Sequence, residues 1–396
     1  MSSQATTAAG GKSRATVMTV FGTRPEAIKM APVIKALAAR PERFRVVVAV
    51  TAQHREMLDQ TLRHFGIKPD FDLNIMKPRQ TLAQIATRAL AGLDEIMGDV
   101  TPDLVLVHGD TATTFIGSLA AFYRHIPVGH VEAGRRTGDK YDPFPEEMNR
   151  RLTGVVADLH FAPTPWAEQN LLREHVDPAH IYVTGNTAVD ALFLTRQDSY
   201  TFADKRLQRL DFAARRVVVV DTLHRRENFG ERMVGIYRAV RRIAEESPEA
   251  QLVVLLHKNP EARDVALREL ESLKGIILME PLDYPDFINL IARAHLVISD
   301  SGGVQEEAPS LGAPVLLLRE KTERPEALEA GTVRMVGTDP QTIYATTCRL
   351  LTDEAAYRAM REARNPYGDG KAAERIADAL EARFGWRETG PDRFQP

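Results

Sequence analysis

Residues 295–318, HLVISDSGGVQEEAPSLGAPVLLL, contain the pattern that decides the fold. An apolar run leads into a polar loop with two glycines, then into a stretch of helical character, and then into a second apolar run. Both runs are rich in Val, Ile and Leu without alternation, which is typical of parallel strands covered on both faces. The stretch therefore predicts one strand–helix–strand unit.

The same alternation extends along the rest of the chain. Similar apolar runs lie at 16–21, 45–51, 103–108, 126–131, 158–162, 181–184, 216–221, 251–257, 275–279, 295–299, 313–318 and 333–336. Helical stretches separate many of them, and two such series predict an α/β fold with two Rossmann-like, doubly wound domains facing a cleft. We place these domains at 15–186 and 187–370, joined by a polar helical pattern within 186–212, after a flexible tail at 1–14.

Charge and cysteine content exclude several classes of protein. The chain of 396 residues has 51 basic and 54 acidic side chains, and this net charge of -3 does not indicate a nucleic-acid partner. Cys348 is the only cysteine, which rules out an intramolecular disulfide and fits a reducing cytoplasm. The 11 histidines form no HExxH motif and no Cys-x-x-Cys occurs, so we expect no metal site.

The sequence also lacks the signals of a membrane or secreted protein. Its first residues, MSSQATTAAGGKSRA, are small and polar and do not provide the apolar core of a signal peptide. No apolar run approaches the about 18 residues that a membrane-spanning helix needs. We therefore predict a cytoplasmic protein with no membrane partner.

The loop inside the opening stretch predicts a phosphate-binding site. Bare backbone at Gly302 and Gly303 lets a phosphate approach closely, and the N–H groups at a helix start attract an anion. Ser301 can add a hydroxyl, and Glu307, about one turn into the helix, can accept hydrogen bonds from ribose hydroxyls. These features indicate the diphosphate and ribose of a nucleotide sugar. The alternative is a tight glycine turn followed by solvated charges at Glu306 and Glu307.

Three further loops of the second half also follow predicted strands. The segments DTLHRREN, HKNP and TERPE bring His224, His257 and Arg324 to strand ends, where cationic groups can bind a diphosphate. On its own, the first of these loops is better explained as a charged helix start without a ligand. Because the carboxyl ends of parallel strands meet at one edge of the sheet, their convergence favours a ligand site.

In the first half, the segment FGTRPE follows the first predicted strand. The spacing of Thr23 and Glu26 is that of a capping box, which explains both residues structurally. It does not explain Arg24 or Lys29, which are candidate contacts to a diphosphate.

Three carboxylates of the first half form a candidate catalytic group. Asp110 and Glu132 follow successive predicted strands, and Glu146 stands at a predicted helix start. Each alone is better explained as an N-cap or a surface charge. Together, in the half opposite an anion site, they suggest proton transfer at a bound sugar.

These segments together resemble a known family. The motifs are FGTRPEAIKMAP, TAQHREMLDQ, FDLNIMK, LVHGDT, PVGHVEAG, PEEMNR, VTGN, HRREN, DSGGVQEEAPSLG, TERPEA, VGTD and NPYGDG, in order from about Val17 to about Leu380. They are similar to those of the bacterial non-hydrolysing UDP-N-acetylglucosamine (UDP-GlcNAc) 2-epimerases.

The resemblance implies a GT-B-like fold, a homodimer, and no need for a metal or nicotinamide cofactor. It implies reversible conversion of UDP-GlcNAc into UDP-N-acetylmannosamine (UDP-ManNAc) through loss and return of UDP and a 2-acetamidoglucal intermediate, feeding cell-surface polysaccharide synthesis. It also implies that 371–396 carries a last helix, at Lys371–Phe384, that packs back on the first domain.

The resemblance also assigns residues by motif. Those that match nucleotide-sugar contacts are Arg24, Lys29, Asp110, Glu132, His224, Leu282, Phe287, Ser301, Gly302, Gly303, Glu307 and Arg324, of which Leu282 and Phe287 border the uracil. Those that match the catalytic group are Asp110, Glu132, Glu146 and His224. Bacterial members also bind a second UDP-GlcNAc as an activator, and the matching residues are Gln53, Arg79, Glu146, Arg225 and His257.

The chain departs from the family pattern at Arg135, Asp142 and Lys258, where Leu, Ser and a different residue are usual. Other activities use the same fold and UDP site. A glycosyltransferase would need an acceptor, a hydrolysing relative would release free ManNAc, and a nucleotide-sugar sensor would bind without turnover. The set of acids favours the epimerase, because binding alone does not require them.

Overall fold

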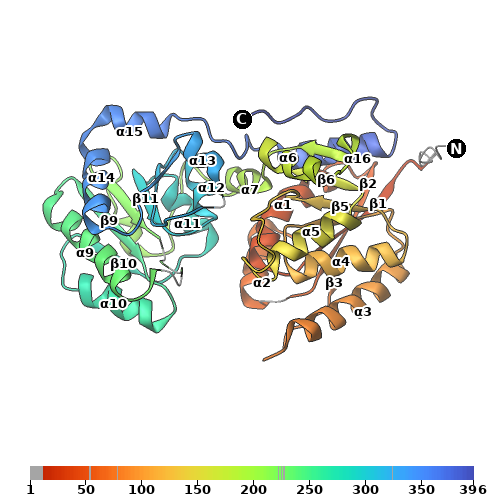
Figure 1. The fold of residues 1–396 in the computed structure, drawn as a ribbon, viewed down its shortest axis with the longest axis horizontal. Coiled ribbons are helices and arrows are strands. Elements are labelled where there is room, and N and C mark those ends of the chain that lie inside the picture. Colours follow the sequence, from red (N-terminus) through yellow and green to blue (C-terminus); the bar gives the residue numbers. More distant parts are fainter. Residues whose placement is uncertain are drawn as a thin grey trace. The chain divides into compact units, whose positions relative to one another are not determined.

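The computed structural model describes residues 12–52, 55–77, 79–221, 223, 225, 228–322 and 324–396. The chain divides into two compact units, which are coloured along the sequence in Figure 1. The first unit runs through Ala191 and takes in Gly368–Pro396, and the second unit is Leu192–Tyr367. Each unit is an α/β domain built on one parallel sheet.

The sheet of the first unit has the strand order β3-β2-β1-β4-β5-β6-β7. Its strands are β1 (Ala15–Phe21), β2 (Phe44–Val50), β3 (Phe71–Asp72), β4 (Leu104–His108), β5 (Val128–Val131), β6 (Leu159–Ala162) and β7 (Ile181–Val183). All neighbouring pairs are parallel, with Val17 of β1 opposite Val46 of β2 and Leu104 of β4. The order reverses between β1 and β4, which is the switch point where doubly wound sheets bind ligands.

Helices cover both faces of this sheet. They are α1 (Arg24–Ala38), α2 (Arg55–Phe65), α3 (Leu82–Val100), α4 (Ala112–Tyr123), α5 (Glu146–Val156), α6 (Pro165–Arg173), the 3-10 turn Pro178–His180 and α16 (Ala372–Arg383). Helix α7 (Thr187–Thr195) begins in the first unit and ends in the second. Val17 and Phe21 of β1 join the core beneath α1, α2 and α16, whereas Met18 and Val20 join the core beneath α3 and α4. Burial on both faces explains the apolar runs without alternation.

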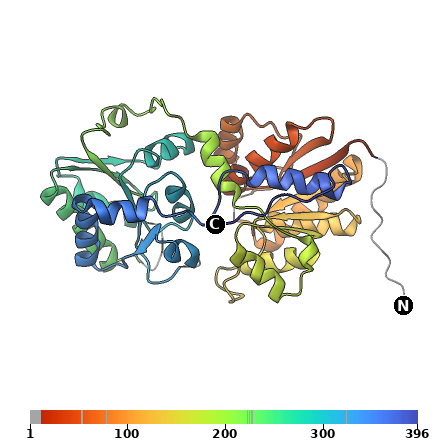
Figure 2. The same ribbon diagram turned by 90° about the horizontal axis from the view of Figure 1, so that it is seen from above.

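The helix expected at Lys371–Phe384 is α16, which packs on α1 within the first unit (Figure 2). Ile376 and Leu380 enter the core beneath α1. Asp190 accepts hydrogen bonds from the backbone N–H groups of Ala372 at 3.2 Å and Ala373 at 2.8 Å. This carboxylate therefore caps the helix just where the returning chain enters the first unit.

The sheet of the second unit has the order β10-β9-β8-β11-β12-β13. Its strands are β8 (Arg216–Val220), β9 (Ala250–Leu255), β10 (Ile276–Met279), β11 (Leu296–Ser299), β12 (Val315–Leu317) and β13 (Val333–Met335). Its helices are α8 (Lys205–Gln208), α9 (Glu231–Glu246), α10 (Pro260–Leu270), α11 (Tyr284–Ile291), α12 (Val304–Ser310), α13 (Pro325–Glu329), α14 (Pro340–Thr352) and α15 (Glu354–Arg361). Here the order reverses between β8 and β11.

The predicted fold class of two doubly wound α/β domains is confirmed. Every predicted apolar run holds a strand, while β3 was missed because its two residues form no apolar run. The predicted tail lies largely at 1–11, outside the described residues; of its remainder, Lys12 pairs with Asp103 at 2.6 Å. In the described part of the chain, no helix is both long and apolar enough to cross a membrane.

Candidate functional site

In the first unit, Glu26 joins the two loops at the switch point. Its carboxylate accepts the backbone N–H of Thr23 at 2.8 Å and the hydroxyl of Thr111 at 2.8 Å. Thr23 follows β1 and Thr111 follows β4, so one side chain, 2% exposed, fixes the loops that precede α1 and α4. The sequence explained Glu26 only as a helix cap, and the second role required the sheet order.

Glu132 is the centre of a buried charge cluster at the end of β5. Lys29 donates to its carboxylate, Arg135 lies 3.4 Å from it, and the Nε2 of His108 lies 3.6 Å from it. The Glu132 side chain is only 9% exposed. Burial alone would raise the pKa of Glu132, but Arg135 and Lys29 hold this pKa well below its usual value. The carboxylate is therefore ionised at neutral pH although little water reaches it.

Two cations share the carboxylate of Glu132. Lys29 was predicted to contact a diphosphate, and in this structure its ammonium group binds Glu132. Arg135, which departs from the family pattern, supplies a second cation to the same carboxylate. Glu132 itself has a positive φ of 63°, in the left-handed region that non-glycine residues seldom adopt, which marks it as a functional candidate.

Asp110 lies in the turn after β4 and is held from α5. Arg150 donates to the same Asp110 oxygen through Nε at 2.9 Å and through Nη2 at 2.7 Å. Asn149 donates its side-chain amide to the backbone oxygen of Asp110 at 2.8 Å. The Asp110 side chain is still 29% exposed, so it is fixed in position and remains accessible.

The two adjacent glutamates at the start of α5 have different surroundings. Glu147 is fully buried and accepts the backbone N–H groups of Thr137 at 3.0 Å and Gly138 at 3.3 Å, and it also pairs with Arg150. Glu146, the predicted catalytic acid, begins α5 as expected. Its Oε2 is buried and has no hydrogen-bond partner among the described residues. Glu147 thus anchors the network, whereas one oxygen of Glu146 is buried without a hydrogen-bond partner among the described residues.

A buried histidine supports the turn that carries Asp110. His130 of β5 lies with its Nε2 2.7 Å from the carbonyl oxygen of Gly109, and burial lowers the pKa of His130 to about 3. The imidazole is therefore neutral and donates from Nε2 to that carbonyl. Gly109 has a φ of 71°, which favours glycine in the turn.

In the second unit, Gly302 lies directly against Arg324. A Cβ added at Gly302 would come within 2.6 Å of Nη1 of Arg324, so a side chain at this position would displace the guanidinium. Arg324 is held by Glu306, whose Oε1 accepts its Nε–H at 2.6 Å. Glu306 is 1% exposed, so the interpretation of Glu306 as a solvated charge is wrong. Glu306 thus holds the guanidinium of Arg324 beside the backbone of Gly302.

Two buried aspartates join the loops at the second switch point. Asp300, at the end of β11, accepts the backbone N–H of Arg225 at 3.1 Å and the amide of Asn228 at 3.0 Å. Asp221, at the end of β8, accepts the hydroxyl of Ser299 at 3.0 Å. Neither aspartate was predicted, although an acid directly after a buried apolar run was the available signal.

The remaining predicted contacts of the second unit are placed as follows. Ser301 is half-buried and donates its backbone N–H to the hydroxyl of Ser299 at 3.0 Å. Gly303 is exposed and is the N-cap residue of α12, and Glu307 lies in the first turn of that helix. Leu282 and Phe287 are half-buried, just before α11 and within it.

Arg24 and the predicted activator residues are distributed over both units. Arg24 is the half-buried first residue of α1, and Arg79 is an exposed residue with a φ of 58° before α3. In the second unit, Arg225 follows β8, and His257 follows β9 and accepts the backbone N–H of Asn259 at 3.0 Å. The two remaining assignments, His224 and Gln53, lie outside the described residues.

Among the residues that the structure describes, no group of three or more His, Cys, Asp and Glu side chains is arranged to hold a metal ion. The predicted site residues are carboxylates and cations in the first unit, and a glycine loop with an arginine in the second. Two doubly wound domains of this kind define a two-domain α/β protein with a GT-B-like fold. A family model for UDP-N-acetylglucosamine 2-epimerase matches residues 35–381. The chain belongs to the bacterial non-hydrolysing UDP-N-acetylglucosamine 2-epimerase family and is an isomerase, as the motifs predicted.

Relatives of this family match almost the whole chain. The UDP-N-acetylglucosamine 2-epimerase of Bacillus subtilis (strain 168) is 55% identical over 378 residues, which are 96% of this chain and 98% of that protein. The Neisseria meningitidis UDP-GlcNAc 2-epimerase, solved bound to UDP-GlcNAc, is 47% identical with a TM-score of 0.84, covering 93% of this chain and 100% of that one. The S. aureus MnaA–UDP structure is 49% identical with a TM-score of 0.85, covering 96% and 100%.

Proposed function

We propose that the chain interconverts UDP-GlcNAc and UDP-ManNAc by eliminating UDP and adding it back through a 2-acetamidoglucal intermediate. Family membership supports the substrate, because the Neisseria meningitidis relative was solved with UDP-GlcNAc bound. The observation that carries the proposal is Glu132, a buried carboxylate kept ionised by Lys29 and Arg135.

The chemistry explains why such a carboxylate is needed. The C2–H bond of the sugar has no neighbouring carbonyl, so its proton is barely acidic. When the C1–O bond breaks, UDP leaves with the bonding electrons and positive charge develops at C1, which makes the C2 proton removable. A carboxylate takes this proton and the C2–H electrons form the C1=C2 double bond of the glucal. Re-addition reverses these steps, with a proton delivered to the opposite face of C2.

In this proposal, residues of the second unit bind the UDP that leaves the sugar. The backbone at Gly302 and Gly303 offers close approach to the diphosphate, and Arg324, positioned by Glu306, adds a cation beside it. His224 completes this group in the proposal. Stabilising UDP as an anion lowers the barrier to breaking the C1–O bond, because that charge develops only in the transition state.

The first unit supplies the proposed acids and bases. Asp110 is fixed by Arg150, Glu132 is held ionised by cations, and Glu146 keeps a buried oxygen that the described residues leave unpaired. Proton removal and return on two faces of C2 needs more than one such group. In this scheme Lys29 exchanges its partner from Glu132 to the substrate diphosphate when the nucleotide sugar binds.

We extend the proposal to the remaining family properties. The product UDP-ManNAc feeds cell-surface polysaccharide synthesis in the cytoplasm, and the enzyme works as a homodimer. UDP-GlcNAc also activates it through Gln53, Arg79, Glu146, Arg225 and His257. A rise of initial rate with UDP-GlcNAc that is steeper than hyperbolic would support this activation, and a hyperbolic dependence would count against it.

Incubation of the pure chain with UDP-GlcNAc in deuterated buffer tests the mechanism. We expect UDP-ManNAc with deuterium at C2, because the proton removed from C2 exchanges with solvent before re-addition. UDP-ManNAc without deuterium at C2 would rule the elimination route out. Free ManNAc would identify a hydrolysing enzyme, turnover that requires an acceptor would identify a glycosyltransferase, and binding without any turnover would identify a sensor.

A further inference from the structure

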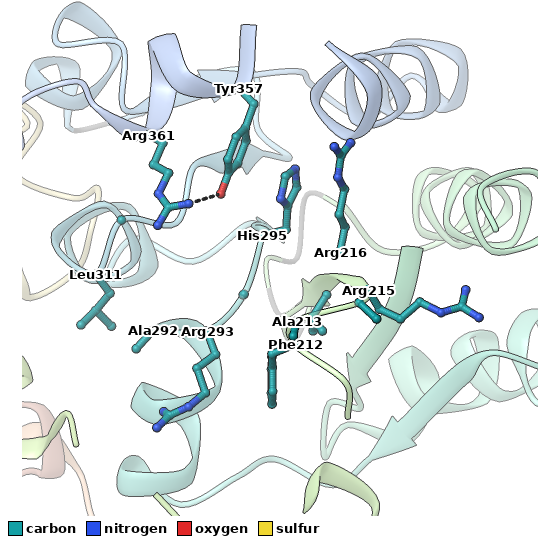
Figure 3. A pocket seen from close by; sticks show the side chains of 14 residues that line it. Phe212, Ala213, Arg215, Arg216, Ala292, Arg293, His295, Leu311, Tyr357 and Arg361 are labelled. Atoms are coloured by element: carbon teal, nitrogen blue, oxygen red, sulfur yellow. Dashed lines mark hydrogen bonds between the residues drawn. The ribbon is translucent and has the colours of Figure 1, made fainter. Parts of the chain in front are cut away.

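A pocket of about 460 Å³ lies in the second unit, away from the loops described above (Figure 3). Its walls come from residues just before β8 and β11 and from the ends of α12 and α15. The glycine loop follows β11 at its carboxyl end, whereas this pocket lies at its amino end. The four residues of β11 separate the two places by roughly 13 Å.

One wall of the pocket is a row of four side chains, Arg216, His295, Tyr357 and Arg361 (Figure 3). The rings of His295 and Tyr357 stack with centroids 3.8 Å apart and an interplanar angle of 10°. Arg361 lies beyond the tyrosine and donates to its hydroxyl at 3.4 Å. Arg216 stands on the other side of the imidazole, so a guanidinium flanks the stack at each end.

The stack itself is rigid and neutral. Nε2 of His295 lies 2.9 Å from the carbonyl oxygen of Leu350 and donates to it. Burial lowers the pKa of His295, so the imidazole carries no charge near neutral pH. Tyr357 is 5% exposed, which leaves little of its ring for a ligand to stack on. The charge of this wall therefore comes from the two arginines.

That positive charge is not balanced within the pocket. None of the described residues that line it is an aspartate or glutamate. The carboxylate of Glu354 interacts electrostatically with His295. That carboxylate already accepts a hydrogen bond from Nε of Arg358 at 2.9 Å. The other lining arginines have backbone partners: Arg215 donates to Pro248, and Arg293 donates to Asn289 at 2.8 Å. Arg216 and Arg361 remain available at the surface of the pocket.

We propose that this pocket binds a phosphate-type oxyanion through the guanidinium groups of Arg216 and Arg361 at the two ends of the row. A guanidinium donates two parallel N–H groups, which match the oxygens of a phosphate, so each end of the row offers one such contact. The pocket is larger than a phosphate ion, so it also admits a phosphomonoester with a small organic group. The site is distinct from the UDP loop because it lies at the opposite end of β11.

Calorimetric titration of the full chain with inorganic phosphate and with glycerol 3-phosphate tests the proposal. UDP is first titrated and then kept saturating, so that the glycine loop is filled while the pocket is measured. We expect saturable binding of at least one of the two probes, and the tighter one identifies the free ion or the monoester. We expect Arg216→Gln with Arg361→Gln to weaken it at least about tenfold, because charge-assisted hydrogen bonds are lost.

The matched control is Arg238→Gln with Arg268→Gln. It removes the same charge from the same unit, at exposed arginines that neighbour Glu269 and do not line the pocket. Equal binding by the wild type and the pocket variant, or no saturable binding by the wild type, would overturn the proposal. The single Arg361→Gln variant, at an exposed side chain, repeats the test without disturbing the fold. Failure of UDP to bind counts against the proposed function alone, and the titrations are then run without it.

Discussion

The two units share one strand order around the switch point but place opposite chemistry there. In the first unit the loops after β4 and β5 present Asp110 and Glu132, each held by cations. In the second unit the loop after β11 presents glycine backbone and an arginine held by the buried Glu306. In one case the fold fixes carboxylates with arginine and lysine, and in the other it fixes an arginine with a carboxylate.

The contrast shows that the doubly wound sheet determines only where a ligand loop stands. Three strands on one side of the reversal and three on the other occur in both units, apart from β7 at the edge of the first sheet. What each unit does to a ligand depends on the few residues after each strand. Substitutions in these loops should therefore separate chemistry from binding according to the unit they lie in.

The largest expected effect is a loss of turnover when the carboxylates of the first unit are substituted. Glu132→Gln and Asp110→Asn keep the shape of each side chain and remove the charge. We expect each to lower kcat by about 100- to 10,000-fold, the usual range for a lost acid or base, with UDP affinity nearly unchanged. Rates followed by NMR and UDP titration by calorimetry check this. Wild-type turnover in both variants would remove these two residues from the catalytic group.

The next largest expected effect is a loss of UDP affinity when the glycine loop of the second unit is substituted. Gly302→Ala places a Cβ 2.6 Å from Nη1 of Arg324 and should displace that guanidinium. We expect UDP affinity to fall about tenfold to a hundredfold, which corresponds to one or two charge-assisted hydrogen bonds.

Gly303→Ala is the matched control for this loop. Gly303 has a φ of -64°, and the nearest atom to an added Cβ is the Ser301 hydroxyl oxygen at 4.0 Å. Because Gly303 belongs to the proposed diphosphate loop but its added Cβ does not meet Arg324, we expect this variant to lose less UDP affinity than Gly302→Ala does. Equal losses in the two alanine variants would mean that Arg324 is not the contact that matters.

A smaller effect is expected at the network that holds Asp110. Arg150→Gln removes the hydrogen bonds of 2.9 Å and 2.7 Å to the carboxylate of Asp110. Arg151→Gln removes a contact to Glu147 and none to Asp110. We expect kcat to fall about tenfold in the first variant and to stay near wild type in the second, with KM little changed in both. A KM increase at constant kcat would assign Arg150 to substrate binding instead.

The smallest expected effect is a shift of the pH profile. Arg135 helps to hold the pKa of Glu132 below its usual value, so Arg135→Leu should raise that pKa. Glu132 then ionises only at higher pH, and the acid limb of log(kcat/KM) should move to higher pH by about one unit. Arg135→Lys keeps the charge and should restore the wild-type limb. An unmoved limb in the leucine variant would show that Glu132 does not control it.

The sequence predicted the helices, the strands and the catalytic candidates, but not the side chains with which these candidates pair. Glu146 was placed correctly at a helix start, yet nothing in its spacing distinguished it from Glu147, which proved to be the buried anchor. A solvated Glu306 stayed open as an alternative because Arg324, its partner, lies 18 positions away in the chain. Such pairs form across loops, so local patterns carry no trace of them.

The sequence by itself determined the α/β class, the strands and the family, because buried parallel strands and loop motifs are local patterns of residue type. Only the tertiary structure decided the strand order, the pairing of Glu132 with Lys29 and Arg135, and the arginine row at the amino end of β11. The physical reason is that burial and charge pairing depend on which segments the sheet brings together. Lys29 and Glu132, for example, lie 103 positions apart in sequence.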